Sequence, residues 1–197
     1  HWQSIWEAER DDCSRVELGM WAAPQRNYWV NKINHAVRRY DRPVIIAAHG
    51  LACVAVAWWA TLESPQWQEW VAGALLVAPT EAPIDEPDAG LETFGPTPRS
   101  LLPFPSIVIA SQNDPKVPFE RAKQLARDWG STFENAGELG HINAGSDLGS
   151  WEIGQQFLSS LVGDASRSSL ATRFTADAPS LWARRIYGDG PIAAGRS

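Results

Sequence analysis

The residues that could do chemistry lie in three short stretches, and the first of them contains a sharp turn. The apolar run "VIIAA" stops at His49-Gly50, and small apolar residues at helical spacing begin at Leu51. Strand, sharp turn and helix in this order form a nucleophile elbow, the G-x-S-x-G turn that exposes a catalytic serine. Here the five positions read Ala48, His49, Gly50, Leu51 and Ala52, so a glycine occupies the place of the serine.

The second and third stretches supply a carboxylate and an imidazole. Asp114 follows the apolar run "SIVIAS", and His141 follows "TFENA" and a glycine-rich turn. Functional groups collect at the carboxyl ends of strands in a parallel α/β sheet, so both residues are expected at one edge. A neutral imidazole can take the proton of a nucleophile there, while the carboxylate holds its other nitrogen. The order of nucleophile position, acid and base is also that of α/β-hydrolases.

Each of these residues also has a simpler interpretation. Asp114 precedes a proline, so it could serve only a turn or a helix N-cap, and His141 could be a loop histidine without a role. His49 is expected to pack beside the turn as a structural residue, and His35 to face solvent from a helix. Cys53 is expected to face the core, where a thiol without a positive neighbour is inert. Gly50, Asp114 and His141 are therefore interpreted together, because their order after successive strands is stronger evidence than any one of them.

The elements that must position these residues alternate between strand and helix, which predicts an α/β fold with a mainly parallel sheet. Continuous apolar runs such as "VIIAA" are typical of strands that are buried on both faces. The pattern predicts helices over 2–9, 24–40, 51–63, 118–130 and 150–163, strands over 13–18, 44–48, 72–79, 106–111 and 132–136, and a loop or lid over 80–105.

Composition predicts one domain over 1–162 and a C-terminal appendage over 163–197. The 197 residues are 44% hydrophobic and 20% charged, enough for a sizeable core. From about Gly163 the chain is rich in Arg, Ser, Ala and Gly without a clear period, so we expect the appendage to be largely disordered, with one short helix near 180–187.

Charge and cysteine content exclude several classes of protein. A net charge of −6 does not suit nucleic acid or an anionic membrane surface, which need a basic face. No apolar run reaches the roughly 20 residues of a membrane helix. Cys13 and Cys53 give neither a disulfide framework nor a zinc spacing, so we expect two buried thiols and a cytoplasmic protein.

Several longer stretches point to a family. They are "HWQSIWE", "YWVNKINHAV", "PVIIAAHGLACVAVAWWA", "ALLVAP", "SIVIASQNDPKVPFERAKQLARDWGS" and "GHINAGSDLGSW", spread over about residues 1–162. On them the chain resembles the small serine hydrolases of the retinoblastoma-binding-protein-9-like family, in the α/β-hydrolase superfamily. The resemblance implies a three-layer sandwich, with Asp114 as the acid of a Ser-His-Asp triad and His141 as its base. It also makes the backbone N–H of Leu51 one donor of an oxyanion hole.

Two departures from that family bear on activity. Gly50 deletes the nucleophile hydroxyl, although glycine relieves the strain that an elbow imposes on its central residue. The family also has a strand and a loop with a second oxyanion donor ahead of the position of His1. That strand would lie between 13–18 and 44–48, and it is missing from the sequence as it stands.

The resemblance implies hydrolysis of a small ester or amide without a metal or cofactor, impaired here because Gly50 stands at the nucleophile position. Whether the chain is an enzyme is left open. The alternative is a non-catalytic pseudoenzyme that binds a ligand or a protein partner, and attack by a water that His141 activates is a third route. A covalent serine-hydrolase probe separates an enzyme with a nucleophile from the other two.

Overall fold

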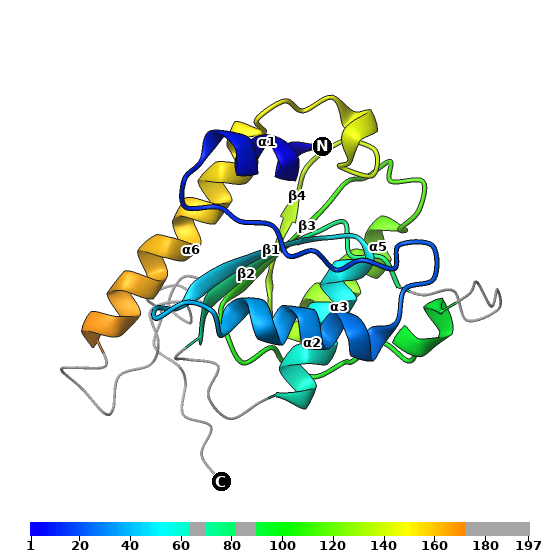
Figure 1. The fold of residues 1–197 in the computed structure, drawn as a ribbon. Helices are drawn as coiled ribbons and strands as arrows, with labels where there is room; N and C mark the ends of the chain where they lie inside the picture. The colour runs from blue at the N-terminus through cyan, green and yellow to red at the C-terminus, as the bar shows by residue number, and fades with distance from the viewer. Residues whose placement is uncertain (64–69, 82–89, 172–197) are drawn as a thin grey trace, which may run out of the picture.

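The protein is built on a four-stranded parallel sheet, seen in a computed structural model that describes residues 1–63, 70–81 and 90–171 (Figure 1). The strands follow one another across the sheet in chain order. All three neighbouring pairs are parallel. The strands are β1 (Val44–His49), β2 (Val71–Val77), β3 (Ser106–Ala110) and β4 (Thr132–Asn135).

Side chains of the central strands alternate between two separate cores. Ala74 and Leu76 of β2 pack on one face of the sheet, whereas Leu75 and Val77 pack on the other. Because successive side chains of a strand point to opposite faces, a strand buried on both sides must be apolar throughout. This explains the unbroken apolar runs of the sequence.

Helices cover both faces of the sheet and complete a three-layer sandwich (Figure 1). The expected α/β architecture is confirmed. The first face carries α2 (Arg26–Val37), α3 (Leu51–Leu62) and α5 (Phe119–Trp129), and the second carries α1 (Trp2–Glu9) and α6 (Glu152–Ala171). Two short 3-10 helices lie in loops, η1 (Leu91–Phe94) and η2 (Ala144–Ser146).

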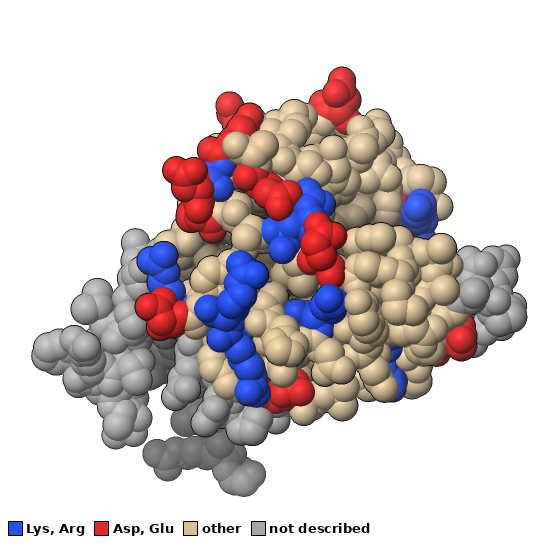
Figure 2. Space-filling view, in the orientation of Figure 1, with Lys and Arg blue, Asp and Glu red and all other residues tan. Residues whose placement is uncertain are grey.

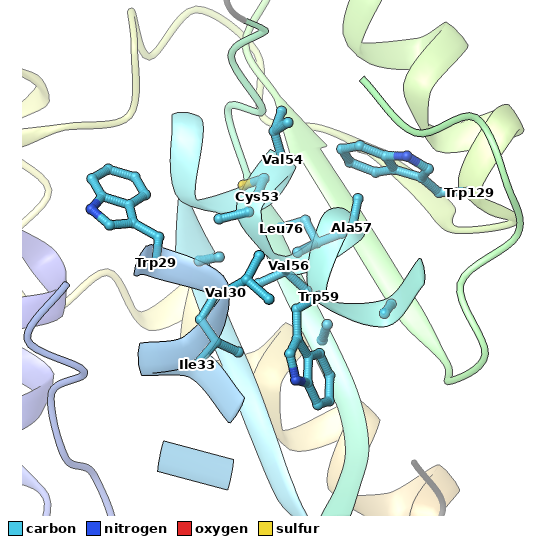
Figure 3. Packing of buried hydrophobic residues seen from close by; sticks show 14 of the residues in the cluster. Trp29, Val30, Ile33, Cys53, Val54, Val56, Ala57, Trp59, Leu76 and Trp129 are labelled. Atoms are coloured by element: carbon cyan, nitrogen blue, oxygen red, sulfur yellow. The ribbon is translucent and has the colours of Figure 1, made fainter. Parts of the chain in front are cut away.

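The larger core joins α2, α3 and α5 to the sheet through tryptophans (Figure 3). Trp29, Trp59 and Trp129 are each no more than 2% exposed. Their indole N–H groups donate to Gly19 O at 2.9 Å, to Asn34 Oδ1 at 3.3 Å and to Pro98 O at 2.8 Å. A buried indole keeps its large apolar area in the core only if its N–H finds an acceptor, and these three do.

The prediction of a strand over 13–18 is wrong. Residues 13–20 run without secondary structure, and side chains rather than a ladder hold them. The guanidinium of Arg15 pairs with Glu7 at 2.7 Å, and the hydroxyls of Ser14 and Tyr40 lie 2.6 Å apart. Residues 14–17 face solvent, with Val16 itself 38% exposed, whereas Leu18 packs into the core.

Within the described residues, β1 consequently lies at the edge of the sheet, paired with β2 alone. The amide of Gln3 covers part of this edge, because its Nε2 donates to the carbonyl oxygen of Ala47 at 3.0 Å. A central strand between 13–18 and β1 is not part of the described structure. Its place in the sequence-based expectation depended on the strand at 13–18, which does not form.

Two helix boundaries and one cysteine also differ from expectation. The second helix begins at Arg26 rather than Pro24, and the last continues to Ala171 rather than ending near 163. Cys13 is only partly buried, whereas Cys53 is buried as expected. The short helix expected near 180–187 lies outside the described residues.

Charged side chains of both signs are mixed on the left half of the face drawn in Figure 2. Of the helices in the described part of the chain, none combines the length and apolar character that crossing a bilayer requires.

Candidate active site

Polar groups and a sharp turn meet at the carboxyl edge of the sheet. Gly50 directly follows β1, Thr80 lies just beyond β2, Asp114 follows β3, and His141 lies in the loop after β4. Because the strands are parallel, their carboxyl ends share one edge, where side chains from four loops can converge.

Gly50 forms the tightest part of the turn between β1 and α3. Its φ of 60° and ψ of −130° lie where L-residues are strained and glycine is not. Its N–H donates to Val77 O at 2.9 Å, and its carbonyl accepts from Thr80 N at 3.2 Å and from Cys53 N at 3.1 Å. These bonds tie the turn to β2 and to the first turn of α3, so the central residue is held facing the edge.

A side chain at this position would point at His141. A Cβ built on Gly50 lies 3.8 Å from His141 Nε2 and 3.8 Å from Thr80 Oγ1, which are ordinary van der Waals distances. A serine hydroxyl extends about 1.4 Å beyond its Cβ, so it would come within hydrogen-bond range of Nε2. The turn therefore has the room and the direction of a nucleophile elbow.

Asp114 and His141 form the buried polar pair of this edge. Asp114 Oδ2 lies 2.8 Å from His141 Nδ1, and the two side chains are 2% and 8% exposed. Since the carboxylate accepts the Nδ1–H, the neutral ring keeps Nε2 free as an acceptor. The other oxygen of Asp114 accepts the N–H groups of Lys116 at 2.8 Å and Val117 at 3.2 Å, so the expected turn contacts are present beside the contact with His141.

The loops that carry this pair are fastened to each other. Gln112 N donates to Gly137 O at 2.7 Å, and Gly140 N donates to Asn113 Oδ1 at 2.7 Å. Ser111 Oγ accepts from Leu139 N at 2.8 Å. Bonds of this kind fix the loop after β4 against the loop after β3, which holds His141 in reach of Asp114.

His49 supports the pair from the strand side. Its Nε2–H donates to the backbone carbonyl of His141, with Nε2 and O 2.9 Å apart. Burial lowers the pKa of His49 to about 4, so the ring is neutral at pH 7. Sequence reasoning expected His49 to pack beside the turn, but this bond to the candidate base depends on the tertiary fold and was missed. His35 is exposed, as expected.

A cavity of about 480 Å³ lies over the turn. One part of its wall is apolar and aromatic, and Lys116 is the one Lys, Arg, Asp or Glu among the described residues that line it. The lining residues are His1, Trp21, Ala22, Pro24, Trp29, His49, Gly50, Leu51, Ala52, Thr80, Leu91, Lys116, His141 and Asn143.

Two further groups bear on the chemistry of this cavity. The N–H of Leu51 stands at the start of α3, where a helix leaves its first amides without intrahelical partners. Cys53 offers no replacement nucleophile, because burial raises the pKa of its thiol and its Sγ contacts Val77 O. The described residues contain no cluster of three or more His, Cys, Asp or Glu that could hold a metal ion.

Thr80 was not among the residues singled out from the sequence. It lies in "VAPTEAP", where nothing marks a threonine as different from any other loop residue. Only the parallel pairing of β1 with β2 brings its hydroxyl to the turn at Gly50.

The family model described as serine hydrolase matches residues 1–160 of this chain. The chain belongs to the serine hydrolase family. A solved structure described as a YdeN-like hydrolase of Pectobacterium atrosepticum is 31% identical, with a TM-score of 0.72 and 84% of each chain covered. These relatives confirm the α/β-hydrolase fold.

More distant structures share the fold. YdeN of Bacillus subtilis is 19% identical, with a TM-score of 0.56 over 71% of this chain and 76% of that chain. Est1E of Butyrivibrio proteoclasticus is 12% identical, with a TM-score of 0.54 over 71% and 72%. Among curated proteins, none matches this chain.

Proposed function

We propose that this serine hydrolase family member carries an esterase-like site for a small ester or amide, in which Gly50 stands at the nucleophile position. Asp114 is the acid of the triad and His141 its base. The N–H of Leu51 is one donor of the oxyanion hole. The chemistry needs neither metal nor cofactor, and we place the protein in the cytoplasm, which suits its two free cysteines.

One observation carries this proposal. A Cβ on Gly50 would lie 3.8 Å from the free Nε2 of His141, whose Nδ1 is 2.8 Å from Asp114. Nucleophile position, base and orienting carboxylate thus stand in the order that acyl transfer requires. Together with the stretches around these residues, this arrangement supports placing the chain among the retinoblastoma-binding-protein-9-like members.

The consequence for activity follows from Gly50. Without a hydroxyl there, the chain cannot form a serine acyl-enzyme, so hydrolysis by the triad route is impaired. Nucleophile and base act as a unit, and removing either one removes most of the rate.

Gly50→Ser tests the proposal. The variant is expected to take up a fluorophosphonate probe and to hydrolyse p-nitrophenyl acetate orders of magnitude faster than the parent chain. The gain should vanish in Gly50→Ser/His141→Ala. Gly137→Ser is the matched control, because Gly137 also has a positive φ of 75° but has nothing within 4 Å of an added Cβ. Serine at a strained position costs roughly 1–3 kcal/mol, so folding is checked by near-UV circular dichroism.

Gly50 also favours a second candidate function, a pseudoenzyme that binds a ligand or a partner without turnover. Trp21 and Trp29 line the cavity, so their fluorescence reports ligands there. If a folded Gly50→Ser variant binds an ester but neither takes up the fluorophosphonate probe nor hydrolyses the ester, this second proposal replaces the first.

A further inference from the structure

The position of Gly50 is flanked by two polar side-chain atoms. The point where a Cβ would stand lies 3.8 Å from His141 Nε2 and 3.8 Å from Thr80 Oγ1. Serine would fill this space with its own hydroxymethyl group. With glycine, the same space can hold a water molecule from solvent.

Both flanking atoms are hydrogen-bond acceptors. His141 Nδ1–H is engaged by Asp114, which leaves Nε2 with a lone pair. Thr80 Oγ1 uses its proton on Ala78 O at 3.1 Å, which leaves its own lone pairs. A water between them can donate one hydrogen to each, so that its oxygen lone pairs turn toward the cavity.

We propose that this chain hydrolyses activated esters by direct attack of a water held between Thr80 Oγ1 and His141 Nε2, with Gly50 providing the room. The inference rests on the proposed function for the position of the substrate carbonyl over the turn. It differs in the nucleophile, which is the water itself.

The reaction balances without any further reactant. His141 Nε2 takes one proton from the water as its oxygen bonds to the carbonyl carbon, and the carbonyl electron pair moves to the oxygen beside Leu51 N–H. The tetrahedral species then collapses. The bond to the leaving oxygen breaks, and that oxygen takes the proton back from Nε2–H. Ester and water give acid and alcohol, and no covalent enzyme intermediate forms.

Supporting contacts hold this geometry in place. Asp114 fixes the ring from one side, while His49 donates to the His141 carbonyl at 2.9 Å. The hydrogen bond from Thr80 to Ala78 orients the threonine hydroxyl, and its backbone N–H is bonded to Gly50 O at 3.2 Å. General-base assistance by a positioned side chain typically contributes about 10²–10⁴-fold in rate.

The test measures p-nitrophenyl acetate turnover by the unaltered 197-residue chain over many turnovers, with intact-mass spectrometry. We expect turnover with no acetyl adduct and no burst. His141→Gln should lower it at least tenfold, whereas His35→Gln, which removes an exposed imidazole, should not. This pair separates the site from the background reactivity of histidines. Turnover that His141→Gln leaves unchanged would overturn the proposal.

Thr80→Val tests the second flank. Loss of one hydrogen bond to the attacking water should lower turnover about three- to tenfold. Thr61→Val is the control, because Thr61 also donates to a backbone carbonyl, Ala57 O at 2.9 Å, but lies on α3 away from the cavity lining. Equal rates for the two variants would exclude Thr80 as a holder of the water.

Gly50→Ala supplies an independent variant that fills the space without adding a hydroxyl. It should abolish the His141-dependent rate while the chain stays folded, and a full rate in this variant would contradict the proposal.

The outcomes distinguish failure of this proposal from failure of the proposed serine site. If Gly50→Ser takes up the probe but the parent chain shows no His141-dependent ester hydrolysis, only the water route is excluded. If the parent chain hydrolyses the ester but Gly50→Ser does not take up the probe, only the serine site is excluded.

Discussion

His49 Nε2 lies 2.9 Å from the backbone carbonyl oxygen of His141, so one histidine holds the main chain of the other. The donor role requires a neutral or cationic ring with hydrogen on Nε2, and burial keeps the ring neutral by lowering its pKa from 6.5 to about 4. Since the unfolded chain takes up this proton at a higher pH than the folded protein does, the burial of His49 makes the stability of the fold depend on pH in mild acid.

His49 is therefore predicted to make the protein less stable in mild acid. The contribution is constant above about pH 6.5 and is lost as the pH falls toward about 4. At pH 5 the free energy of unfolding should be about 2 kcal/mol lower than at pH 7 because of this group. Urea unfolding of the parent and of His49→Gln, which keeps a donor but does not titrate, measures the difference. Equal pH slopes for the two chains would contradict the prediction.

Asp114→Asn is predicted to remove the base function of His141 and to leave the turn intact. The asparagine oxygen can still accept from the N–H groups of Lys116 and Val117, but its amide donates to Nδ1 and thereby places the ring proton on Nε2. In the Gly50→Ser background, the rate of ester hydrolysis should fall about 10⁴-fold. Asp147→Asn, at an exposed position of the neighbouring loop, is the control. A rate within tenfold of the background would show that Asp114 only caps the turn.

The sequence predicted the sheet better than it predicted the neighbours of the candidate site. Residues 44–48, 72–79 and 106–111 are continuous apolar runs, and they form β1, β2 and β3 within two residues of the expected ends. Their short length and the turn residues that bound them favour buried strands over helices. The stretch 13–18 alternates in the same way as a half-buried strand, but local ion pairing of Arg15 and the absence of a ladder partner in the described residues decide against it.

Asp114 and His141 could be singled out because each is a titratable residue that follows a strand. Thr80 also follows an expected strand, but a threonine hydroxyl carries no such signal, and the contact of His49 depends on the tertiary fold. Strand order sets which loops meet at an edge, but the atoms that face each other depend on φ and ψ of single residues. With φ at 60°, a Cβ built on Gly50 points toward both His141 and Thr80, and no sequence pattern specifies that angle.

Lys116 is predicted to favour substrates with a negative group. It is exposed and is the one Lys, Arg, Asp or Glu among the described cavity-lining residues. In Gly50→Ser, Lys116→Gln should raise KM about two- to fivefold for a p-nitrophenyl ester with a carboxylate on its acyl chain, and not for the neutral ester. Lys123→Gln on α5, whose ammonium pairs with Glu120 at 3.6 Å, is the control. The difference should shrink in 0.5 M salt, and equal effects on both esters would refute the charge argument.

Cys53 is predicted to be unreactive toward thiol reagents in the folded protein. Burial raises the pKa of its thiol, and its exposed fraction is 0%. A disulfide reagent at pH 7 should therefore modify Cys13 first, since that side chain is partly exposed, although burial also raises its pKa. Peptide mapping after timed labelling gives the order. Modification of Cys53 in native buffer at the rate seen in urea would contradict its place in the core.

Removal of residues 164–197 is predicted to leave the domain folded. The buried side chains of α6 that are described, Leu158 and Leu161, pack against the sheet and stay in the shortened chain. We therefore expect the melting temperature to fall by less than about 5 °C, which corresponds to about 1 kcal/mol or somewhat more for a domain of this size. A second truncation that removes only 172–197 separates the end of α6 from the rest of the appendage. If the longer deletion lowers the melting temperature further and the shorter one does not, the last turns of α6 belong to the domain, and its proposed boundary near 162 moves to 171.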